Sequence, residues 1–261
     1  MKKTGEETLT KINNLQLIQR NDFQNFTLDS ALLSDFITIN RTIKNALDIG
    51  TGNGIISLLL ANRSKANIVA IELYEIMAEI AKRNVINNKL EDRIDVIQAD
   101  IRDYEKHFKK DNFDLIFCNP PYFEYDGNNA QVNELDQLAK ARHEIDITIK
   151  EIIQISAYLL RNKGYFTLVF RSDRVFEVVE MLKAHNLAPK RIKYCYTGKD
   201  KDSKLCLIEA VKDASQGVKV EYPIFIYDDN GEKTEYIKKL YEIYGWNFTY
   251  CSKFGTINSE K

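Results

Sequence analysis

Four residues that follow an apolar stretch carry the side chains best suited to chemistry. They are Asn119, Pro120, Pro121 and Tyr122, directly after residues 113–118. The apolar and aromatic stretch is typical of a strand buried on both faces. Two consecutive prolines stop a strand ladder and oppose an immediate helix, so we expect a rigid loop there. In open α/β sheets, ligands bind at the carboxyl ends of the strands.

This loop suits methyl transfer to an exocyclic amine on a planar base or amide. The lone pair of such an amine is delocalised, so a site helps by aligning the nitrogen with the methyl group. It also helps by accepting hydrogen bonds from both N–H groups while positive charge develops on nitrogen. We expect the Asn119 side-chain oxygen and the Pro120 carbonyl to accept, and Tyr122 with Phe123 to stack on the target. The alternative is a rigid turn without chemistry.

A glycine-rich loop supplies the second candidate site. It contains Asp48, Gly50, Gly52 and Gly54, and Glu72 ends the next expected strand. Glycines permit positive φ angles and let the backbone approach a ligand closely. A carboxylate at the position of Glu72 can accept from both ribose hydroxyls of an adenosine-type cofactor.

The charge of this loop favours S-adenosylmethionine over NAD. The dinucleotide pattern is G-x-G-x-x-G, whereas this spacing is one residue shorter and follows Asp48. That carboxylate would repel a pyrophosphate but would attract the ammonium of S-adenosylmethionine. Asp100 ends the third strand and could accept from the adenine amine, or it could cap the helix expected at 102–108. We also expect Leu73 and Ile101 to contact the cofactor.

Strands and helices alternate along most of the chain. Strands are expected at 46–49, 67–73, 93–99, 113–118, 165–170, 192–196 and 204–211, and helices at 55–61, 74–88, 149–160 and 174–184. Such alternation predicts a doubly wound, mostly parallel α/β sheet. Residues 8–18 fit neither element clearly, and a helix ending near Phe36 starts with Thr27 or Asp29 as its cap. A strand-like run at 223–227 and an amphipathic helix at 235–244 follow.

The composition is that of an ordinary globular protein. The 261 residues are 44% hydrophobic and 29% charged, and the net charge is −1. We expect no membrane span and no signal peptide, because no apolar run is long enough and none follows the first lysines. The four cysteines form no CxxC pair and the three histidines are scattered, so we expect reduced thiols, a cytoplasmic location and no metal.

Positive charge gathers in one part of the chain. Residues 161–204 hold eleven Lys or Arg against five Asp or Glu. A polyanion could bind such a face, or the face could simply be solvated. If the partner is RNA, the residues expected to hold phosphates are Arg171, Arg174, Lys190, Arg191 and Lys193.

The motifs together resemble a known class of enzymes. The glycine loop, Glu72, Asp100 and the Asn119–Tyr122 loop are similar to class I S-adenosylmethionine-dependent amino-methyltransferases, whose fold is Rossmann-like. Three outer segments narrow the resemblance to the bacterial family that includes tRNA(Val) adenine-37 N6-methyltransferases. These are residues 26–33, 141–144 and 227–231. The resemblance extends over roughly residues 15–244.

This resemblance implies a seven-stranded sheet whose last strand is antiparallel. It also implies that Phe26, Asp29 and Ser30 close over the cofactor and that residues 119–122 bind a flipped-out adenine. We expect an N-terminal extension at 1–36, a methyltransferase domain at 37–215 and a C-terminal extension at 216–261 packed on the same domain. The chain departs from expectation in one respect, because its amino terminus carries no basic arm for tRNA.

The predicted function is N6-methylation of an unpaired adenosine in tRNA. Pro121, Phe123, Arg142, His143 and Arg171 are expected to contact the substrate, while residues 123–139 form either a lid or a surface loop. Methylation of a protein glutamine amide or of another nucleic acid stays an alternative, although about 45 residues before the sheet are too few for the helical domain of glutamine methyltransferases. A third alternative is a non-catalytic protein that binds a nucleotide or RNA. Protein partners are not predicted.

Overall fold

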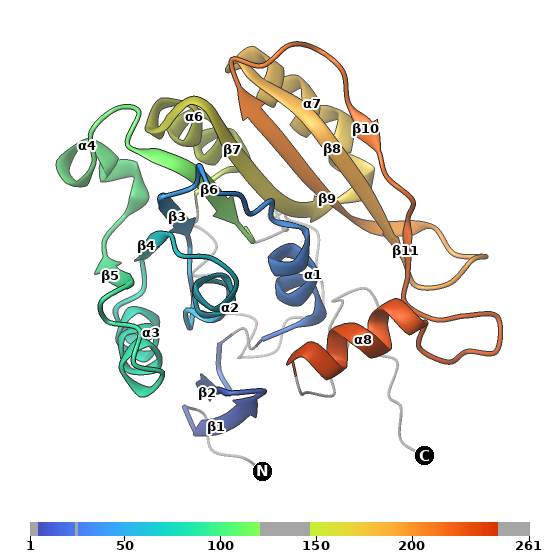
Figure 1. Ribbon diagram of the computed structural model, residues 1–261, viewed down its shortest axis with the longest axis horizontal. Helices are drawn as coiled ribbons and strands as arrows, with labels where there is room; N and C mark the ends of the chain where they lie inside the picture. Colours follow the sequence, from blue (N-terminus) through green and yellow to red (C-terminus); the bar gives the residue numbers. More distant parts are fainter. Residues whose placement is uncertain (1–4, 24–25, 121–146, 245–261) are drawn as a thin grey trace, which may run out of the picture.

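A mostly parallel β-sheet with helices on both faces forms the body of the protein (Figure 1). The structure is a computed structural model, and it describes residues 5–23, 26–120 and 147–244. Within these residues, no helix combines the length and the apolar character that crossing a membrane requires.

Seven long strands form the sheet in the order β5-β4-β3-β6-β7-β9-β8. They are β3 (Asn45–Ile49), β4 (Asn67–Glu72), β5 (Ile94–Gln98), β6 (Phe113–Cys118), β7 (Leu160–Arg171), β8 (Leu187–Tyr196) and β9 (Ser203–Lys212). The last of these, β9, is antiparallel to both of its neighbours, whereas the other pairs are parallel. The predicted α/β class and Rossmann-like topology are therefore confirmed.

Two short strands extend the sheet beyond this prediction. β10 (Lys219–Val220) and β11 (Ile224–Phe225) both pair in parallel with β8, at different levels, and bring the sheet to nine strands within residues 5–23, 26–120 and 147–244. β11 lies inside the strand-like run expected at 223–227. Both strands belong to the segment that follows the seven-stranded core, so this segment lies along the outer edge of β8.

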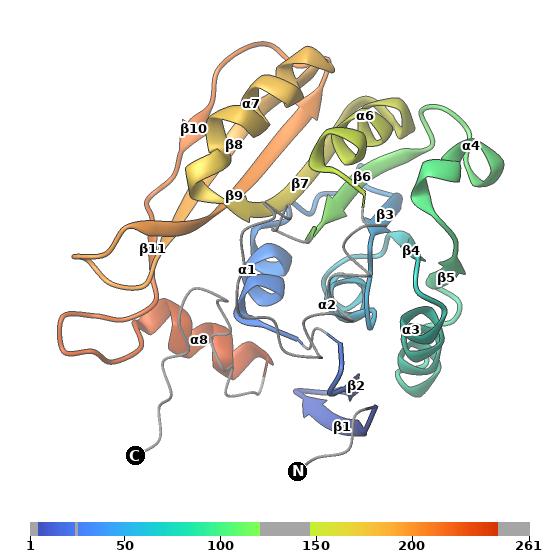
Figure 2. The same cartoon turned by 180° about the vertical axis from the view of Figure 1, so that it is seen from behind.

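Helices cover both faces of the sheet and separate two cores (Figures 1 and 2). One face carries α1 (Leu28–Phe36), α2 (Ile55–Arg63), α3 (Glu75–Asn87) and α8 (Glu235–Tyr244), and the other carries α4 (Tyr104–His107), α6 (Ile149–Leu159) and α7 (Val175–Ala184). Along β6, Leu115 and Phe117 enter the first core while Ile116 and Cys118 enter the second. This alternation follows from the two-residue period of a strand.

The ambiguous amino-terminal segment is a β-hairpin. β1 (Glu7–Ile12) and β2 (Leu15–Arg20) pair in antiparallel fashion around a two-residue turn. Asn13 adopts a φ of 52°, a left-handed conformation that asparagine tolerates in tight turns. Leu15 and Leu17 are buried and Gln16 between them is exposed, so one face of the hairpin joins the core beside α3.

The start of α1 differs in detail from a side-chain-capped helix. Thr27 occupies the cap position with an extended backbone, but its side chain makes no capping bond. Its buried hydroxyl has no hydrogen-bond partner among the residues that the structure describes. By contrast, Thr148 and Glu151 form a complete capping box at the start of α6.

Candidate active site

The loop between β3 and α2 leaves room for a ligand above its glycines. Gly50, Gly52 and Gly54 adopt φ angles of 69°, 59° and 84°. Within the described part of the chain, a Cβ placed on Gly50 would meet no atom within 4 Å, and one on Gly52 would meet only Met77 Cε at 3.9 Å. The backbone N–H groups of Gly50 and Thr51 donate to the Ile71 carbonyl at 3.0 and 3.1 Å. Hydrogen bonds thus hold the loop to β4, and the described residues leave space beside the Cα atoms of Gly50 and Gly52.

Glu72 is joined to this loop by its side chain. The carboxylate is buried, and it accepts from the Gly52 N–H at 2.8 Å and from the Tyr74 N–H at 3.0 Å. The end of β4 and the glycine loop are therefore held together by one acid. The predicted ribose contact of Glu72 stays a prediction.

Asp48 is a buried acid beneath the loop. Its side chain is 1% exposed, and Oδ2 accepts from the hydroxyls of Thr51 and Ser57, each at 2.7 Å. Burial raises the pKa of the Asp48 carboxyl to about 6, although the two hydroxyl bonds act in the opposite direction. Among the described residues no cation forms an ion pair with Asp48. A cationic group bound above the loop would therefore favour ionisation of this acid.

Asp100 caps a short helix, which is the second of the two roles that the sequence allows for it. Its carboxylate accepts from the Arg102 N–H at 2.9 Å at the start of a short 3₁₀ helix (Ile101–Asp103), and it pairs with the Arg102 guanidinium at 2.5 Å. The bond from Arg102 lowers the pKa of Asp100. Nearby, Ile101 is buried and Leu73 is half-buried, with its carbonyl accepting from the Gln98 side chain. Their contacts with a cofactor stay predictions.

The amino-terminal segment meets the Asn-Pro loop. Phe26, Asp29 and Ser30 are buried, and Ser30 Oγ accepts from the side-chain nitrogen of Asn119 at 3.3 Å. Asn119 is half-buried and Pro120 is buried. The contact brings together two residues 89 positions apart in the sequence, both of which the sequence singled out. Their roles in binding and catalysis stay predictions.

Five predicted site residues lie outside the described part of the chain. These are Pro121, Tyr122, Phe123, Arg142 and His143, together with the loop at 123–139.

Several cations of the basic stretch at 161–204 pair with acids. Arg171 pairs with Asp173 at 2.5 Å and Arg174 pairs with Glu177 at 2.6 Å. Arg191 pairs at 3.0 Å with Glu209, which is 2% exposed. The charge of Arg191 is thus used inside the fold, contrary to the phosphate-binding role expected for it, while Arg171 and Arg174 lie at the carboxyl end of β7.

The sequence prediction missed Asn84, a polar residue on the buried face of α3. Its side chain is fully buried, with Oδ1 accepting from the Ile18 N–H at 2.7 Å and Nδ2 donating to the carbonyls of Ile18 at 3.0 Å and Asn53 at 2.9 Å. One amide therefore connects the hairpin, α3 and the glycine loop. The available signal was an asparagine among the apolar positions of an amphipathic helix.

The described residues contain no group of three or more His, Cys, Asp or Glu side chains placed to hold a metal ion. The polar groups of the site are instead carboxylates, hydroxyls and amides around an open glycine loop. This set of groups fits an organic ligand that carries a positive charge and hydroxyl groups.

Solved structures with similar folds are methyltransferases. A structure described as a predicted O-methyltransferase from Agrobacterium tumefaciens has a TM-score of 0.65 and 20% identity, covering 82% of this chain and 95% of that one. Geranyl diphosphate C-methyltransferase from Streptomyces coelicolor, solved with S-adenosyl-L-homocysteine, has a TM-score of 0.52 and 12% identity, covering 71% and 77%. These similarities establish the fold.

Sequence relatives narrow the assignment. A family described as a methyltransferase domain matches residues 46–142. Proteins named tRNA1(Val) (adenine(37)-N6)-methyltransferase from Cytophaga hutchinsonii and Aliivibrio fischeri are 31% and 30% identical, covering 68% and 80% of this chain and 71% and 86% of theirs. A protein of the same name from Bacteroides thetaiotaomicron is 41% identical over 49% of this chain and 52% of its own. The chain belongs to the tRNA1(Val) (adenine(37)-N6)-methyltransferase family, as its motifs predicted.

Proposed function

We propose that this protein transfers the methyl group of S-adenosylmethionine to N6 of an unpaired adenosine in tRNA. The observation that carries the proposal is that two neighbouring strands, β3 and β6, end at the same level. Ile49 of β3 lies opposite Cys118 of β6, so the glycine loop and Asn119 leave the sheet side by side. Adjacent strands are about 4.8 Å apart, which places the two candidate binding groups next to each other.

The residues of the loop fit S-adenosylmethionine. The space above Gly50 and Gly52 is open, and Asp48 is a buried acid whose ionisation a bound ammonium would favour. Glu72 is held at the end of β4, where a ribose-binding acid is expected. S-adenosylmethionine supplies an electrophilic methyl group when bound. Asp48 would hold its amino group and Glu72 its ribose, with Asp100 near the adenine.

The Asn119 amide would bind the amine that accepts the methyl group. Its nitrogen already donates to Ser30, which fixes the plane of the amide. An amine nucleophile needs acceptors for its N–H groups, and in this proposal the Asn119 oxygen and the Pro120 carbonyl provide them. Both acceptors stabilise the positive charge that develops on N6. The proton then leaves to water, and Tyr122 is expected to stack on the base.

The proposed substrate is a loop adenosine in tRNA. An unpaired base costs little to extrude, which favours a target in a single-stranded loop. The relatives are named for adenine 37 of tRNA1(Val), and we propose the same target here. β7 continues three residues beyond Leu168, which pairs with Cys118, so Arg171 extends roughly 10 Å past the end of β6. There it could exchange Asp173 for a phosphate.

Location and domain organisation follow from the same proposal. We propose a cytoplasmic location, since tRNA is the proposed substrate and the free, buried thiols of Cys118, Cys195 and Cys206 suit a reducing compartment. We propose that residues 1–36 and 216–261 are extensions of one methyltransferase domain at 37–215. The residues 5–23 and 26–36 lie against the cofactor side, and residues 219–225 join the edge of β8.

A methyl-transfer assay with defined substrates tests the proposal. Purified protein would be incubated with labelled S-adenosylmethionine and unmodified tRNA(Val), followed by nucleoside digestion. We expect one N6-methyladenosine per tRNA, and none when adenosine 37 is replaced by guanosine. A glutamine-containing release factor should not be labelled. Label in that protein, with none in tRNA, would refute the proposal in favour of amide methylation.

A further inference from the structure

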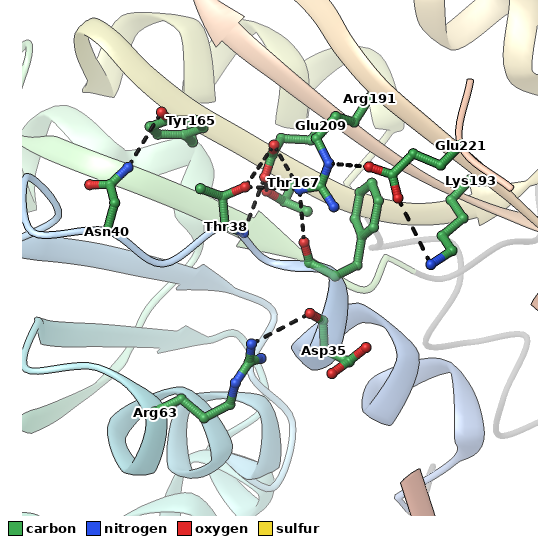
Figure 3. A network of polar contacts seen from close by, with 11 residues as sticks. Asp35, Thr38, Asn40, Arg63, Tyr165, Thr167, Arg191, Lys193, Glu209 and Glu221 are labelled. Carbon is green, nitrogen blue, oxygen red and sulfur yellow. Dashed lines mark hydrogen bonds and ion pairs between the residues drawn. The ribbon is translucent and has the colours of Figure 1, made fainter. Parts of the chain in front are cut away.

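The carboxyl end of α1 is held by arginines from two other elements. Arg63 of α2 donates to the carbonyls of Ser34 and Asp35, and Arg191 of β8 donates to the Phe36 carbonyl at 3.2 Å. The last carbonyls of a helix have no partner within it and carry partial negative charge. Arginines of α2 and β8 therefore donate hydrogen bonds to the last carbonyls of α1 (Figure 3).

Arg191 is the centre of a larger network. Its guanidinium lies 4.2 Å from the centroid of the Phe36 ring, and Nη1 donates to Thr38 Oγ1 at 2.8 Å. Glu209 of β9 faces it at 3.0 Å and accepts from the Thr38 N–H at 3.2 Å and hydroxyl at 2.9 Å. Figure 3 shows Arg191, Thr38 and Glu209 pointing toward one another. Side chains of β8 and β9 thus hydrogen-bond to Thr38, just after α1.

The C-terminal segment contributes to the same network. Glu221, just after β10, pairs with Arg191 at 2.7 Å and with Lys193 at 3.8 Å. Tyr236 of α8 donates from its hydroxyl to Asp35 Oδ2 at 2.7 Å. The segment at 219–221 is therefore linked to the end of α1 through Arg191, whereas α8 contacts it directly through Tyr236.

We infer that Arg191 is a positioning residue for methyl transfer, acting through α1 on the contact between Ser30 and Asn119. Phe36 follows Ser30 by six positions, a helical length of about 9 Å. A short helix moves as a rigid rod, so loosening one end shifts the other. The inference rests on the proposed function, because it assigns Asn119 to the amine. Under this inference, residues 219–244 affect catalysis indirectly, through Glu221 on Arg191 and through Tyr236 on α1.

Replacing Arg191 by lysine tests the inference without removing its charge. A single ammonium lacks the planar fork that serves Phe36, Glu209 and Glu221 together. We expect kcat to fall about tenfold, since small misplacements of reacting groups have large effects, with KM for tRNA within about twofold of the parent. Tyr236→Phe removes the bond to Asp35 and should lower kcat about twofold.

Arg161→Lys is the matched control. Arg161 pairs at 2.6 Å with Asp114, which is 5% exposed, and donates to the Thr42 carbonyl, but it makes none of the bonds that hold α1. Asp114 lies near the amino end of β6, away from Asn119. This variant also weakens a half-buried ion pair, so it reports what such a loss does to folding. Its kcat should equal that of the parent; an equal fall in both variants would overturn the inference.

A double substitution separates positioning from general destabilisation. Ser30→Ala removes the contact through which Arg191 is inferred to act. In that background, Arg191→Lys should lower kcat by less than about twofold, because coupled residues are not additive. If the tenfold effect persists in the Ser30→Ala protein, Arg191 does not act through this contact.

Amide hydrogen exchange tests the same link without tRNA. In Arg191→Lys, amides at 31–37 should exchange at least about tenfold faster than in the parent, while in Arg161→Lys they should not change. Unchanged exchange in Arg191→Lys would overturn the inference. If the parent protein failed to methylate tRNA, the proposed function would fall, and exchange would still decide whether Arg191 anchors α1.

Discussion

Two regions at the carboxyl edge of the sheet, on either side of β6, hold their charged groups in opposite ways. Above β3 and β4, Asp48 and Glu72 are buried and accept from hydroxyls and backbone N–H groups. Beyond β7, Arg171 and Arg174 pair with Asp173 and Glu177, whose side chains are 59% and 41% exposed. The first arrangement is fixed by the fold, whereas the second consists of surface pairs that exchange partners at little cost.

This difference matches two kinds of ligand. A small cofactor that is used in every turnover benefits from preorganised groups that need no rearrangement. A large polyanion such as tRNA releases counterions and replaces protein acids with phosphates, so its binding depends on salt. We therefore expect cofactor affinity to change little with ionic strength and tRNA affinity to change steeply.

The largest effect is expected at the boundary between the two regions. Asn119→Ala should lower kcat by at least about 100-fold, because it removes an acceptor aimed at developing charge. Cofactor affinity should change less than kcat, as measured by calorimetry. Asn62→Ala is the control, since Asn62 lies on the exposed side of α2 and should have parental activity. Parental turnover in Asn119→Ala would contradict the proposed amine clamp.

Asp48→Asn is expected to weaken S-adenosylmethionine binding roughly 30-fold while it stabilises the free protein. Burial raises the pKa of Asp48 to about 6, so the folded state binds this proton more tightly than the unfolded state does. The stability contributed by Asp48 therefore falls as pH rises from about 4 to about 6, leaving a penalty of about 3 kcal/mol above that range. Because asparagine carries no charge, the melting temperature of the Asp48→Asn protein near neutral pH should be higher than that of the parent.

The pH dependence of binding checks the same acid. In the parent, affinity for S-adenosylmethionine should fall about tenfold between about pH 7 and pH 5, as Asp48 becomes protonated. Methylthioadenosine lacks the ammonium, so its affinity should not follow this curve. Asp48→Asn should show a flat profile for both ligands. A parental slope retained in Asp48→Asn would place the titrating group elsewhere.

Asn84→Ala should lower the free energy of unfolding by about 2–3 kcal/mol, because three buried backbone groups lose their partner. Cofactor affinity should also fall several-fold, since the bond to the Asn53 carbonyl holds the glycine loop. Asn88 offers a comparison one helical turn later, where it makes two bonds to Gln16 at the surface. Asn88→Ala should cost about 1 kcal/mol and leave cofactor binding unchanged. Equal losses in urea denaturation would contradict a special role for Asn84.

The smallest effect is expected on the substrate side. Arg171→Gln should raise KM for tRNA about threefold, leave kcat unchanged and reduce the slope of log affinity against log salt by about one. Arg83→Gln is the control, because Arg83 pairs with Glu7 beside the hairpin, away from β7. A salt slope that is identical in all three proteins would remove Arg171 from the tRNA contact.

Local patterns in the sequence were enough to predict the sheet and the core of the candidate site. Three apolar strands show their ends locally: one stops at Ile49 before Gly50, one at the acid Glu72, and one at Cys118 before Asn119 and Pro120. The hairpin at 7–20 was ambiguous because its backbone is held by distant side chains, Asn84 of α3 and Asn88 just after it. β10 and β11 are two residues each and exist only as partners of β8.

Side-chain partners across long sequence separations were beyond such patterns. Arg191 appeared as part of a positive stretch, yet it pairs with Glu209 and Glu221, which lie outside that stretch. Asp100 supported two interpretations, and Arg102 decides its contacts in the structure. Charge counts along a chain describe composition, whereas phosphate binding depends on which charges the fold leaves exposed.

The most direct test of the account is nucleoside mass spectrometry of tRNA from cells that carry or lack this protein. Purified tRNA(Val) would be compared in the parent, a deletion strain, and deletion strains complemented with the parent or with Asn119→Ala. We expect N6-methyladenosine at position 37 in the parent and after complementation with the parent protein, and its loss in the other two strains. Undiminished N6-methyladenosine in the deletion strain, or full restoration by Asn119→Ala, would contradict the account.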